Sequence, residues 1–166
     1  MGDESPKKKI RITDMKVAFT KAASYCAYQE RCQQEVRDKL YSWGLWPEAV
    51  ENIITQLITE NFLNEERFAK AFAGGKFRIK RWGRVKIKME LKKRKISDYC
   101  IKQAMKEIDE RDYMKVLRAL VKEQEEKLKK KKLSGRFAGE IKKQKIMQYC
   151  LARGFEQDLV RDLMER

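Results

Sequence analysis

The chain has 166 residues, of which 42% are hydrophobic, and this length and composition suit one ordinary domain or a few small repeats. It holds no histidine, which excludes an imidazole base, a histidine-ligated zinc and a nucleophile activated by histidine. The formal net charge is +15, and it is unevenly spread: residues 1–75 carry eleven basic and eleven acidic side chains, whereas residues 76–166 carry 29 basic and 14 acidic ones. The second half is therefore expected to meet an anionic partner.

The cysteines and the apolar runs indicate where the protein works. The four cysteines are scattered without a Cys-x-x-Cys pair, so we expect them to be reduced, intracellular and mostly buried: Cys26, Cys32, Cys100 and Cys150. No apolar run approaches the roughly 20 residues of a membrane span, and the first residues lack the apolar stretch of a signal peptide. The sequence therefore predicts a cytoplasmic protein that does not enter a membrane.

The N-terminal part of the chain begins with a polar, charged stretch. Residues 1–12, interrupted by Pro6, are expected to form a mobile arm. Either Thr13 or Asp14 can then cap a first helix, which we place at residues 13–29.

Three further helices follow before residue 76. The second is expected to end at Gly44 in the left-handed conformation, and Pro47, which suits a first helical turn, begins the third. Asn64 caps the fourth. Their apolar faces are Cys32, Val36, Leu40 and Trp43, then Val50, Ile53, Ile54, Leu57 and Ile58, then Phe68, Ala71 and Phe72. No window of strict alternation appears, so the chain is predicted to be all α.

The most basic stretch runs from Lys76 to Lys95 and holds eleven Lys or Arg against one acid, Glu90. A helix is predicted from Arg84 onward. At about 100° per residue, one apolar line on this helix opposes another, so we expect it to pack on two sides, with Ile87 and Leu91 on one and Val85 and Met89 on the other. A basic ridge lies between these lines: Arg84, Lys88, Lys92 and Lys95. Such a ridge attracts phosphates or an acidic protein surface, and a merely solvated face is the alternative.

One helix-turn-helix pattern occurs three times along the chain. Its copies read Val36-x-x-x-Leu40-x-x-x-Gly44-Leu45, Ile87-x-x-x-Leu91-x-x-x-Lys95-Ile96 and Ile146-x-x-x-Cys150-x-x-x-Gly154-Phe155. Single copies are too short to bury their apolar faces alone, so they must stack on one another. We therefore expect an all-α fold of tandem three-helix repeats in an elongated, curved array: repeat 1 at 30–80, repeat 2 at 81–133 and a truncated repeat 3 at 134–166.

A lysine run separates the second and third repeats. Residues 127–132 are expected to end a long helix that begins near Tyr113. A solubilising linker and a contact with a partner are both open interpretations of this run.

Two motifs, together with the threefold repeat, resemble the RecX family from about residue 15 to the end of the chain. They are Glu66-Arg67-Phe68-Ala69-x-Ala71-Phe72 and Arg78-x-x-Arg81-Trp82-Gly83-x-x-Lys86-Ile87-x-x-Glu90-Leu91. Cys32 stands where the family usually has a capping serine, and Lys95 where a glycine usually ends the first helix of the second repeat. Each departure implies a helix cap weaker by about 1 kcal/mol.

The resemblance implies a modulator of RecA that acts in homologous recombination and the SOS response. RecX-like proteins lie in the groove of the RecA–DNA filament and restrain strand exchange, ATP turnover and LexA cleavage. They are not enzymes, need no cofactor, and this one is expected to be a monomer that binds bare DNA weakly and without sequence preference. The residues expected to contact DNA phosphates or acidic RecA surfaces are Arg78, Lys80, Arg81, Arg84, Lys88, Lys92 and Lys95.

Two other expectations concern neighbouring residues. Trp82 either stacks on an exposed base or belongs to the core, the second being the commoner role of a Trp beside a helix start. Glu66 and Arg67 are expected to fix the geometry between helices rather than to bind a partner.

A different class of function is a sequence-independent nucleic-acid-binding protein that needs no recombinase. In that hypothesis residues 86–95 form the recognition helix of a helix-turn-helix unit. An apolar helix face on both sides argues against it, because a recognition helix must expose one face to base edges. Catalysis is disfavoured, since the sequence has no Gly-rich phosphate loop, no carboxylate cluster at metal-ligand spacing and no nucleophile paired with a base.

Overall fold

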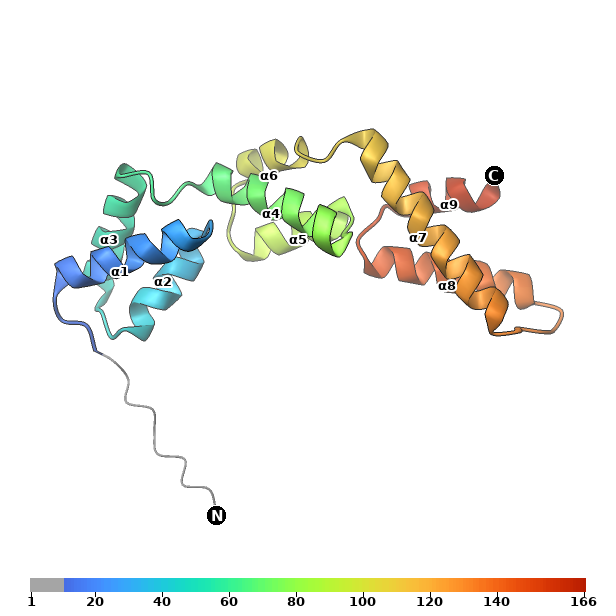
Figure 1. Cartoon of the computed structure of the whole chain (residues 1–166), viewed down its shortest axis with the longest axis horizontal. Coiled ribbons are helices and arrows are strands. Elements are labelled where there is room, and N and C mark those ends of the chain that lie inside the picture. The colour runs from blue at the N-terminus through green and yellow to red at the C-terminus, as the bar shows by residue number, and fades with distance from the viewer. Residues whose placement is uncertain (1–10) are drawn as a thin grey trace, which may run out of the picture. The chain divides into compact units, whose positions relative to one another are not determined.

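The structure, a computed structural model, describes residues 11–166, and within them the chain forms nine helices and no strand (Figure 1). The all-α prediction is therefore confirmed. The chain divides into two compact units, Met1–Phe68 and Ala69–Arg166, which we call unit 1 and unit 2. Among the described residues, no helix is both long enough and apolar enough to cross a membrane.

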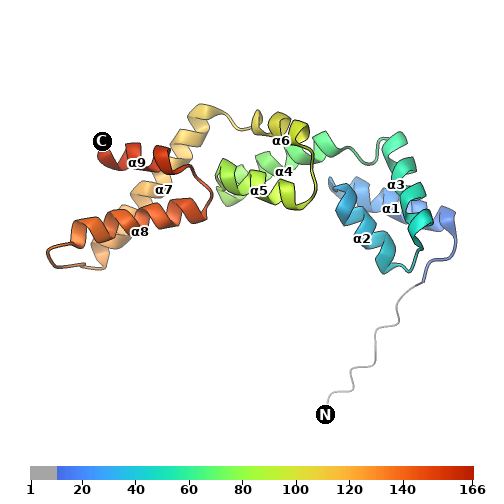
Figure 2. The same cartoon turned by 180° about the vertical axis from the view of Figure 1, so that it is seen from behind.

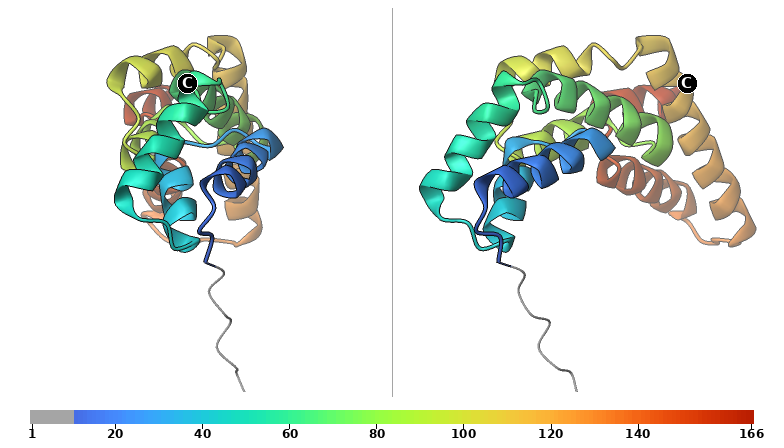
Figure 3. Two further views of the ribbon diagram at one scale, coloured as in Figure 1. Left: turned by 90° about the vertical axis from the view of Figure 1, so that its left-hand side faces the viewer. Right: turned by 60° about the vertical axis from the view of Figure 1, so that its left-hand side comes forward.

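Unit 1 is built on three helices that pack on one another: α1 (Met15–Tyr28), α2 (Gln33–Ser42) and α3 (Pro47–Thr59) (Figure 3). They enclose a core that is almost wholly apolar, with Val36, Leu40, Val50, Ile53 and Leu57 at its centre. Ile58 is 44% exposed, contrary to the sequence prediction. In the last turn of α3 only Leu57 is buried, so Ile58 lies outside the buried face of this helix.

The helix ends of unit 1 follow the predicted signals. Asp14 is the N-cap of α1, and its carboxylate accepts hydrogen bonds from the backbone N–H groups of Lys16 and Val17 at 2.8 and 3.3 Å. Gly44 has a φ of +82° after α2, and Pro47 lies in the first turn of α3. Cys32 is the N-cap of α2, and its own N–H donates to the Glu35 carboxylate at 3.0 Å. This reciprocal bond offsets part of the loss expected from the missing serine.

The expected N-terminal arm is shorter than predicted. Ile12 is 7% exposed, and its N–H donates to the Trp43 carbonyl at 2.9 Å, while Arg11 lies against the turn at Gly44. The prediction of a mobile arm is therefore wrong for residues 11 and 12, because Ile12 has a place in the core of unit 1. The rest of that prediction, residues 1–10, lies outside the described residues.

The N-terminal end of α4 (Glu65–Lys80) belongs to unit 1, and Asn64 caps it by accepting from the Arg67 N–H at 2.8 Å. The Arg67 side chain donates to the Glu30 carboxylate at 2.5 Å and to the Asn61 carbonyl at 3.0 Å. The prediction that Arg67 fixes the geometry between helices is confirmed, since these bonds join the start of α4 to the loops after α1 and α3. A helix cap and a guanidinium that bonds to two neighbouring loops thus define where the fourth helix begins.

Unit 2 contains most of α4 and five further helices, shown from behind in Figure 2. Its core includes a stack of three aromatic rings, in which the Tyr113 centroid lies 5.8 Å from that of Phe77 and 5.0 Å from that of Phe155. The Tyr113 and Phe155 rings are 0% and 1% exposed. The helices are α4 (Glu65–Lys80), α5 (Arg84–Lys93), α6 (Asp98–Met105), α7 (Glu110–Lys130), α8 (Ala138–Ala152) and α9 (Gln157–Glu165).

The turns that end the first helix of each repeat share one conformation. Lys95 and Gly154 have φ values of +59° and +91°, matching Gly44 in unit 1. The apolar residues before these turns, Leu91 and Cys150, are 0% exposed. The repeat alignment predicted from sequence is consistent with these turns, and all four cysteines are buried, as predicted.

Candidate partner-binding surface

The residues predicted to bind a partner lie on α4, on α5, in the three-residue turn between them and just after α5. Five of them are exposed to solvent and form no ion pair within residues 11–166. Two end α4, two lie on α5 and one follows it: Arg78, Lys80, Lys88, Lys92 and Lys95. Positive charge on these side chains is therefore available to an anionic partner.

Arg81, by contrast, is engaged within the protein. It lies just after α4 with a φ of +52°, and its two terminal nitrogens donate to the two Glu123 carboxylate oxygens of α7 at 2.9 and 3.2 Å. This bidentate pair raises the pKa of Arg81 and lowers that of Glu123, in both cases chiefly through the side-chain hydrogen bond. Arg81 thus contacts α7 rather than standing free for phosphate.

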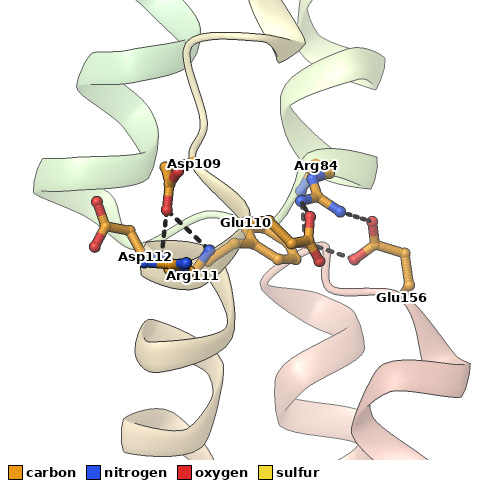
Figure 4. A network of polar contacts seen from close by, with 7 residues as sticks. Arg84, Asp109, Glu110, Arg111, Asp112 and Glu156 are labelled. Carbon is orange, nitrogen blue, oxygen red and sulfur yellow. Dashed lines mark hydrogen bonds and ion pairs between the residues drawn. The ribbon is translucent and has the colours of Figure 1, made fainter.

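Arg84 is engaged more fully, at the point where α5, α7 and the α8–α9 turn meet (Figure 4). Its guanidinium bonds to the Glu110 carboxylate, lies 3.6 Å from Glu156 and sits 3.9 Å from the centroid of the Tyr113 ring. Only 20% of the Arg84 side chain is exposed. Arg84 therefore differs from the other residues of the predicted basic ridge, because its charge is balanced by the carboxylates of Glu110 and Glu156, which are distant in sequence.

Tyr113 holds this junction together with its hydroxyl. The hydroxyl donates to the Glu156 carboxylate at 2.5 Å and accepts from the Arg84 N–H at 3.0 Å. Burial of the phenol and the hydrogen bond to Glu156 both raise the pKa of Tyr113 well above its usual value, so the group stays protonated as a donor. At the neighbouring start of α7, Asp109 accepts from the N–H groups of Arg111 and Asp112 at 2.9 and 3.1 Å (Figure 4).

Backbone contacts join the same elements directly. The Gly83 N–H donates to the Arg153 carbonyl at 2.8 Å, and the Val85 N–H donates to the Gly154 carbonyl at 2.9 Å. A Cβ atom on Gly83 would lie 2.2 Å from the Gly154 oxygen, and one on Gly154 would lie 2.2 Å from the Lys86 Cβ. Both positions therefore require glycine, which explains the Gly of the Trp-Gly motif.

The half-buried indole of Trp82 lies near two cations. The Lys76 and Lys86 ammonium groups are 5.1 and 4.5 Å from the ring centroid. The Phe72 ring lies in the same way near Lys76 at 5.3 Å and Arg94 at 4.8 Å. Alternating cations and rings thus join α4 to α5, and the ring faces attract charges that would otherwise repel one another.

The outer face of α5 differs from the sequence prediction. Ile87 and Leu91 are fully buried, but Val85 and Met89 are 52% and 47% exposed. The prediction that this helix packs on two sides is wrong, because within unit 2 nothing covers the second apolar line. The exposed face combines apolar and basic side chains: Val85, Lys88, Met89 and Lys92. The argument against a recognition helix, which relied on two buried faces, therefore fails.

Sequence reasoning missed the acidic partners of the two arginines. Glu110, Glu123 and Glu156 come from α7 and the α8–α9 turn, far from α5 in sequence. One signal was available in the sequence: a tyrosine that is buried, as Tyr113 is, needs a polar partner for its hydroxyl.

Comparison with known proteins gives the same family at every level. Three family models match the chain: the first three-helix domain of RecX at residues 18–57, the second at 64–105 and the third at 123–164. These domains group α1–α3, α4–α6, and the end of α7 with α8 and α9. The division predicted from the repeats uses the same helices but begins each repeat one helix later.

Several curated relatives are regulatory proteins named RecX. The chain is 31% identical over 97 residues to the one from Prosthecochloris aestuarii, which covers 58% of this chain and 64% of the relative. It is 32% identical over 124 residues to the one from Bacillus licheniformis, covering 74% of this chain and 46% of that protein. The chain thus covers just under two-thirds of the length of the first relative and less than half of the length of the second.

Two crystal structures share the fold. One is RecX from Lactobacillus salivarius, with a TM-score of 0.76, 22% identity and coverage of 91% of this chain and 94% of that one. The other is described as regulatory protein RecX, with a TM-score of 0.78, 16% identity and coverage of 92% and 72%.

Proposed function

Because the chain belongs to the RecX family, we propose that it is a regulatory protein. In this proposal it binds the RecA–DNA filament and restrains the activities of RecA. Those activities are strand exchange, DNA-dependent ATP hydrolysis and the coprotease function that leads to LexA cleavage. In this proposal the protein acts as a cytoplasmic monomer, has no catalytic role and needs no cofactor. Its effect comes from occupying the filament rather than from chemistry on a substrate.

The observation that supports this proposal best is the exposed face of α5, with two cations that form no ion pair among the described residues and two exposed apolar side chains. Lys88 and Lys92 are one helical turn apart, and Val85 and Met89 accompany them. Cations without an intramolecular partner attract phosphates or carboxylates, and the apolar side chains add contact area against a protein wall. A filament groove offers both kinds of surface. Arg78, Lys80 and Lys95 extend the positive region.

The experiment is cosedimentation with RecA filaments assembled on single-stranded DNA, with RecA alone and DNA alone as parallel samples. Reversing two exposed charges, Lys88→Glu and Lys92→Glu, should weaken capture by the filament about 30-fold or more, because a loss of about 1 kcal/mol at each site multiplies. The matched control makes the same charge change on the exposed side of α7, with Lys115→Glu and Lys122→Glu.

The proposal fails at this surface if the α5 variant and wild type sediment equally with the filament. Equal losses in the α5 and α7 variants would assign the effect to net charge rather than to α5. Potency in inhibiting the DNA-dependent ATPase of RecA, titrated at fixed salt, should follow the same order as sedimentation.

A second candidate function is sequence-independent nucleic-acid binding without a recombinase. The same exposed face of α5 favours it, because a helix that is open on one side can enter a groove of DNA. Capture by DNA alone as strong as capture by the filament would support this function. A hundredfold preference for one DNA sequence at physiological salt would instead identify a specific helix-turn-helix reader.

A further inference from the structure

The end of α7, the following loop and the start of α8 form a hairpin (Figure 1). This hairpin carries a second concentration of positive charge in unit 2. Residues 127–145 hold nine basic side chains and one acid, Glu140. All nine are exposed except the half-buried Lys142, and within residues 11–166 none forms an ion pair. We call these nine the hairpin cluster: Lys127, Lys129, Lys130, Lys131, Lys132, Arg136, Lys142, Lys143 and Lys145.

Local helix electrostatics account for only part of the cluster. The lysines in the last turn of α7 lie where the helix dipole favours cations. Lys142, Lys143 and Lys145 lie between the first turn and the middle of α8, away from the C-terminal end that the dipole favours for cations, and Glu140 and Glu125 are the acids on α8 and across the groove. Like charges three residues apart on a helix destabilise it by a few tenths of a kcal/mol. The stability of the fold does not explain why the charges gather here.

An exposed aromatic ring lies within the cluster. Phe137 is the N-cap of α8, makes no capping hydrogen bond and is 62% exposed. Ser, Thr, Asp or Asn at an N-cap would stabilise the helix by about 1 kcal/mol. The Arg136 guanidinium lies 5.7 Å from the centroid of the ring. The exposed ring, with a cation beside it, is therefore available to stack on a partner.

A groove of about 270 Å³ lies between α7 and α8 and is lined in part by the hairpin cluster. Its floor is apolar, since Leu128 and Ile146 are 7% and 4% exposed. Basic side chains form most of its walls: Lys129, Lys142 and Lys143, with Glu125 as the acid. The groove combines an apolar floor with cationic edges, which suits a flat apolar ring attached to an anionic chain.

We propose that the hairpin cluster, Phe137 and this groove bind single-stranded nucleic acid. The cations hold successive phosphates, and Phe137 stacks on an unpaired base. A single strand fits better than a duplex, because base faces are free to stack only when the strands are apart. The site is separate from the outer face of α5 and needs no recombinase, so it goes beyond the proposed function.

The test is fluorescence anisotropy of a labelled oligothymidine of about 20 nucleotides, titrated with protein over a salt series. Neutralising four cations of the hairpin should reduce the log–log salt slope by about 3, since each phosphate contact on a single strand contributes roughly 0.7. The matched control removes four cations from the rest of unit 2 and should change the slope by less than about 1. The hairpin variant is Lys130→Gln, Lys131→Gln, Lys143→Gln and Lys145→Gln; the control is Lys102→Gln, Lys115→Gln, Arg118→Gln and Lys122→Gln.

A second variant tests stacking separately from charge. Phe137→Ala should weaken binding to oligothymidine roughly 5- to 100-fold, the range typical of losing one stacked base. An abasic oligonucleotide of the same length should bind wild type and Phe137→Ala equally. The ring is exposed, so the variant is expected to fold, and far-ultraviolet circular dichroism verifies its helix content.

Three outcomes would overturn the proposal. Equal salt slopes for the hairpin and control variants would show that net charge alone binds the strand. A duplex bound as tightly as the single strand, with no effect of Phe137→Ala, would exclude stacking. Competition by poly-glutamate as effective as competition by oligothymidine would identify an acidic protein as the partner. The Lys88→Glu, Lys92→Glu variant should retain oligothymidine binding, so failure of this site is distinguishable from failure of the proposed function.

Discussion

Removing the Arg84 side chain tests whether the junction of α5, α7 and the α8–α9 turn stabilises unit 2. The Arg84→Ala variant deletes a guanidinium that pairs with Glu110, approaches Glu156 to 3.6 Å and lies 3.9 Å from the centroid of the Tyr113 ring. The backbone N–H of residue 84 keeps its bond to the Tyr113 hydroxyl, so the expected loss comes from the side chain alone.

The magnitude follows from how exposed each partner is. The Glu110 carboxylate is 65% exposed, so this pair contributes about 0.5 kcal/mol, and the partly shielded Glu156, 32% exposed, contributes about as much. The contact with the buried Tyr113 ring adds about 1 to 2 kcal/mol, because the cation is largely withdrawn from water. Arg84→Ala should therefore lower the free energy of unfolding by about 2 to 3 kcal/mol.

The assay is urea unfolding of Arg84→Ala beside Arg78→Ala, whose side chain is exposed and forms no ion pair within residues 11–166. The control should change the free energy of unfolding by less than about 0.5 kcal/mol. If the two variants unfold at the same urea concentration with the same slope, Arg84 does not stabilise the junction and belongs with the exposed cations after all.

Three further predictions concern the turns, the core and the acid range. Lys95→Gly should raise the free energy of unfolding by about 0.5 to 1 kcal/mol, because Lys95 has a φ of +59°, and a loss of stability in thermal melts would contradict this. Leu40→Ala and Leu91→Ala, at fully buried positions of two repeats, should each cost about 2 to 5 kcal/mol, and a wild-type melting curve for either would refute the repeat alignment there. Hydrogen bonds from Lys93 and then Arg94 lower the pKa of Glu90, so the folded protein holds the Glu90 proton less tightly than the unfolded chain does. This contribution is complete above the unfolded value of about 4.3 and is lost as the pH falls through the lower folded value. Glu90→Gln should make the free energy of unfolding less dependent on pH in this range. An unchanged pH dependence would show that the bonds from Lys93 and Arg94 to Glu90 do not stabilise the folded protein.

The helices and turns could be predicted because their signals are local. Asp14, Gly44, Pro47 and Asn64 act within one helical turn of themselves, through hydrogen bonds or backbone conformation, and the structure places each in the predicted role. The threefold pattern of apolar residues likewise gave the turn at Lys95, although a lysine stands there. Such features need no knowledge of distant partners.

The surface could not be predicted to the same extent, because it depends on pairs distant in sequence. Helical spacing groups Arg84 with Lys88 and Lys92, but only the tertiary structure brings Glu110 and Glu156 to Arg84. Periodicity likewise marks Val85 as apolar without saying whether anything covers it. The roles of the exposed cations, including Lys88, stay predictions that binding experiments must test.

The backbone contact between the start of α5 and the α8–α9 turn has a consequence for synthesis of the protein. The Gly83 and Val85 N–H groups bond to the carbonyls of Arg153 and Gly154, which a ribosome adds roughly 70 residues later, or about 4 to 14 s at roughly 5 to 20 residues per second. Unit 1 closes its core among residues already made. During synthesis, unit 1 can therefore fold while the first residues of α5 still lack their hydrogen-bond partners in the α8–α9 turn. Chaperones have several seconds in which to bind α5 before that turn is made.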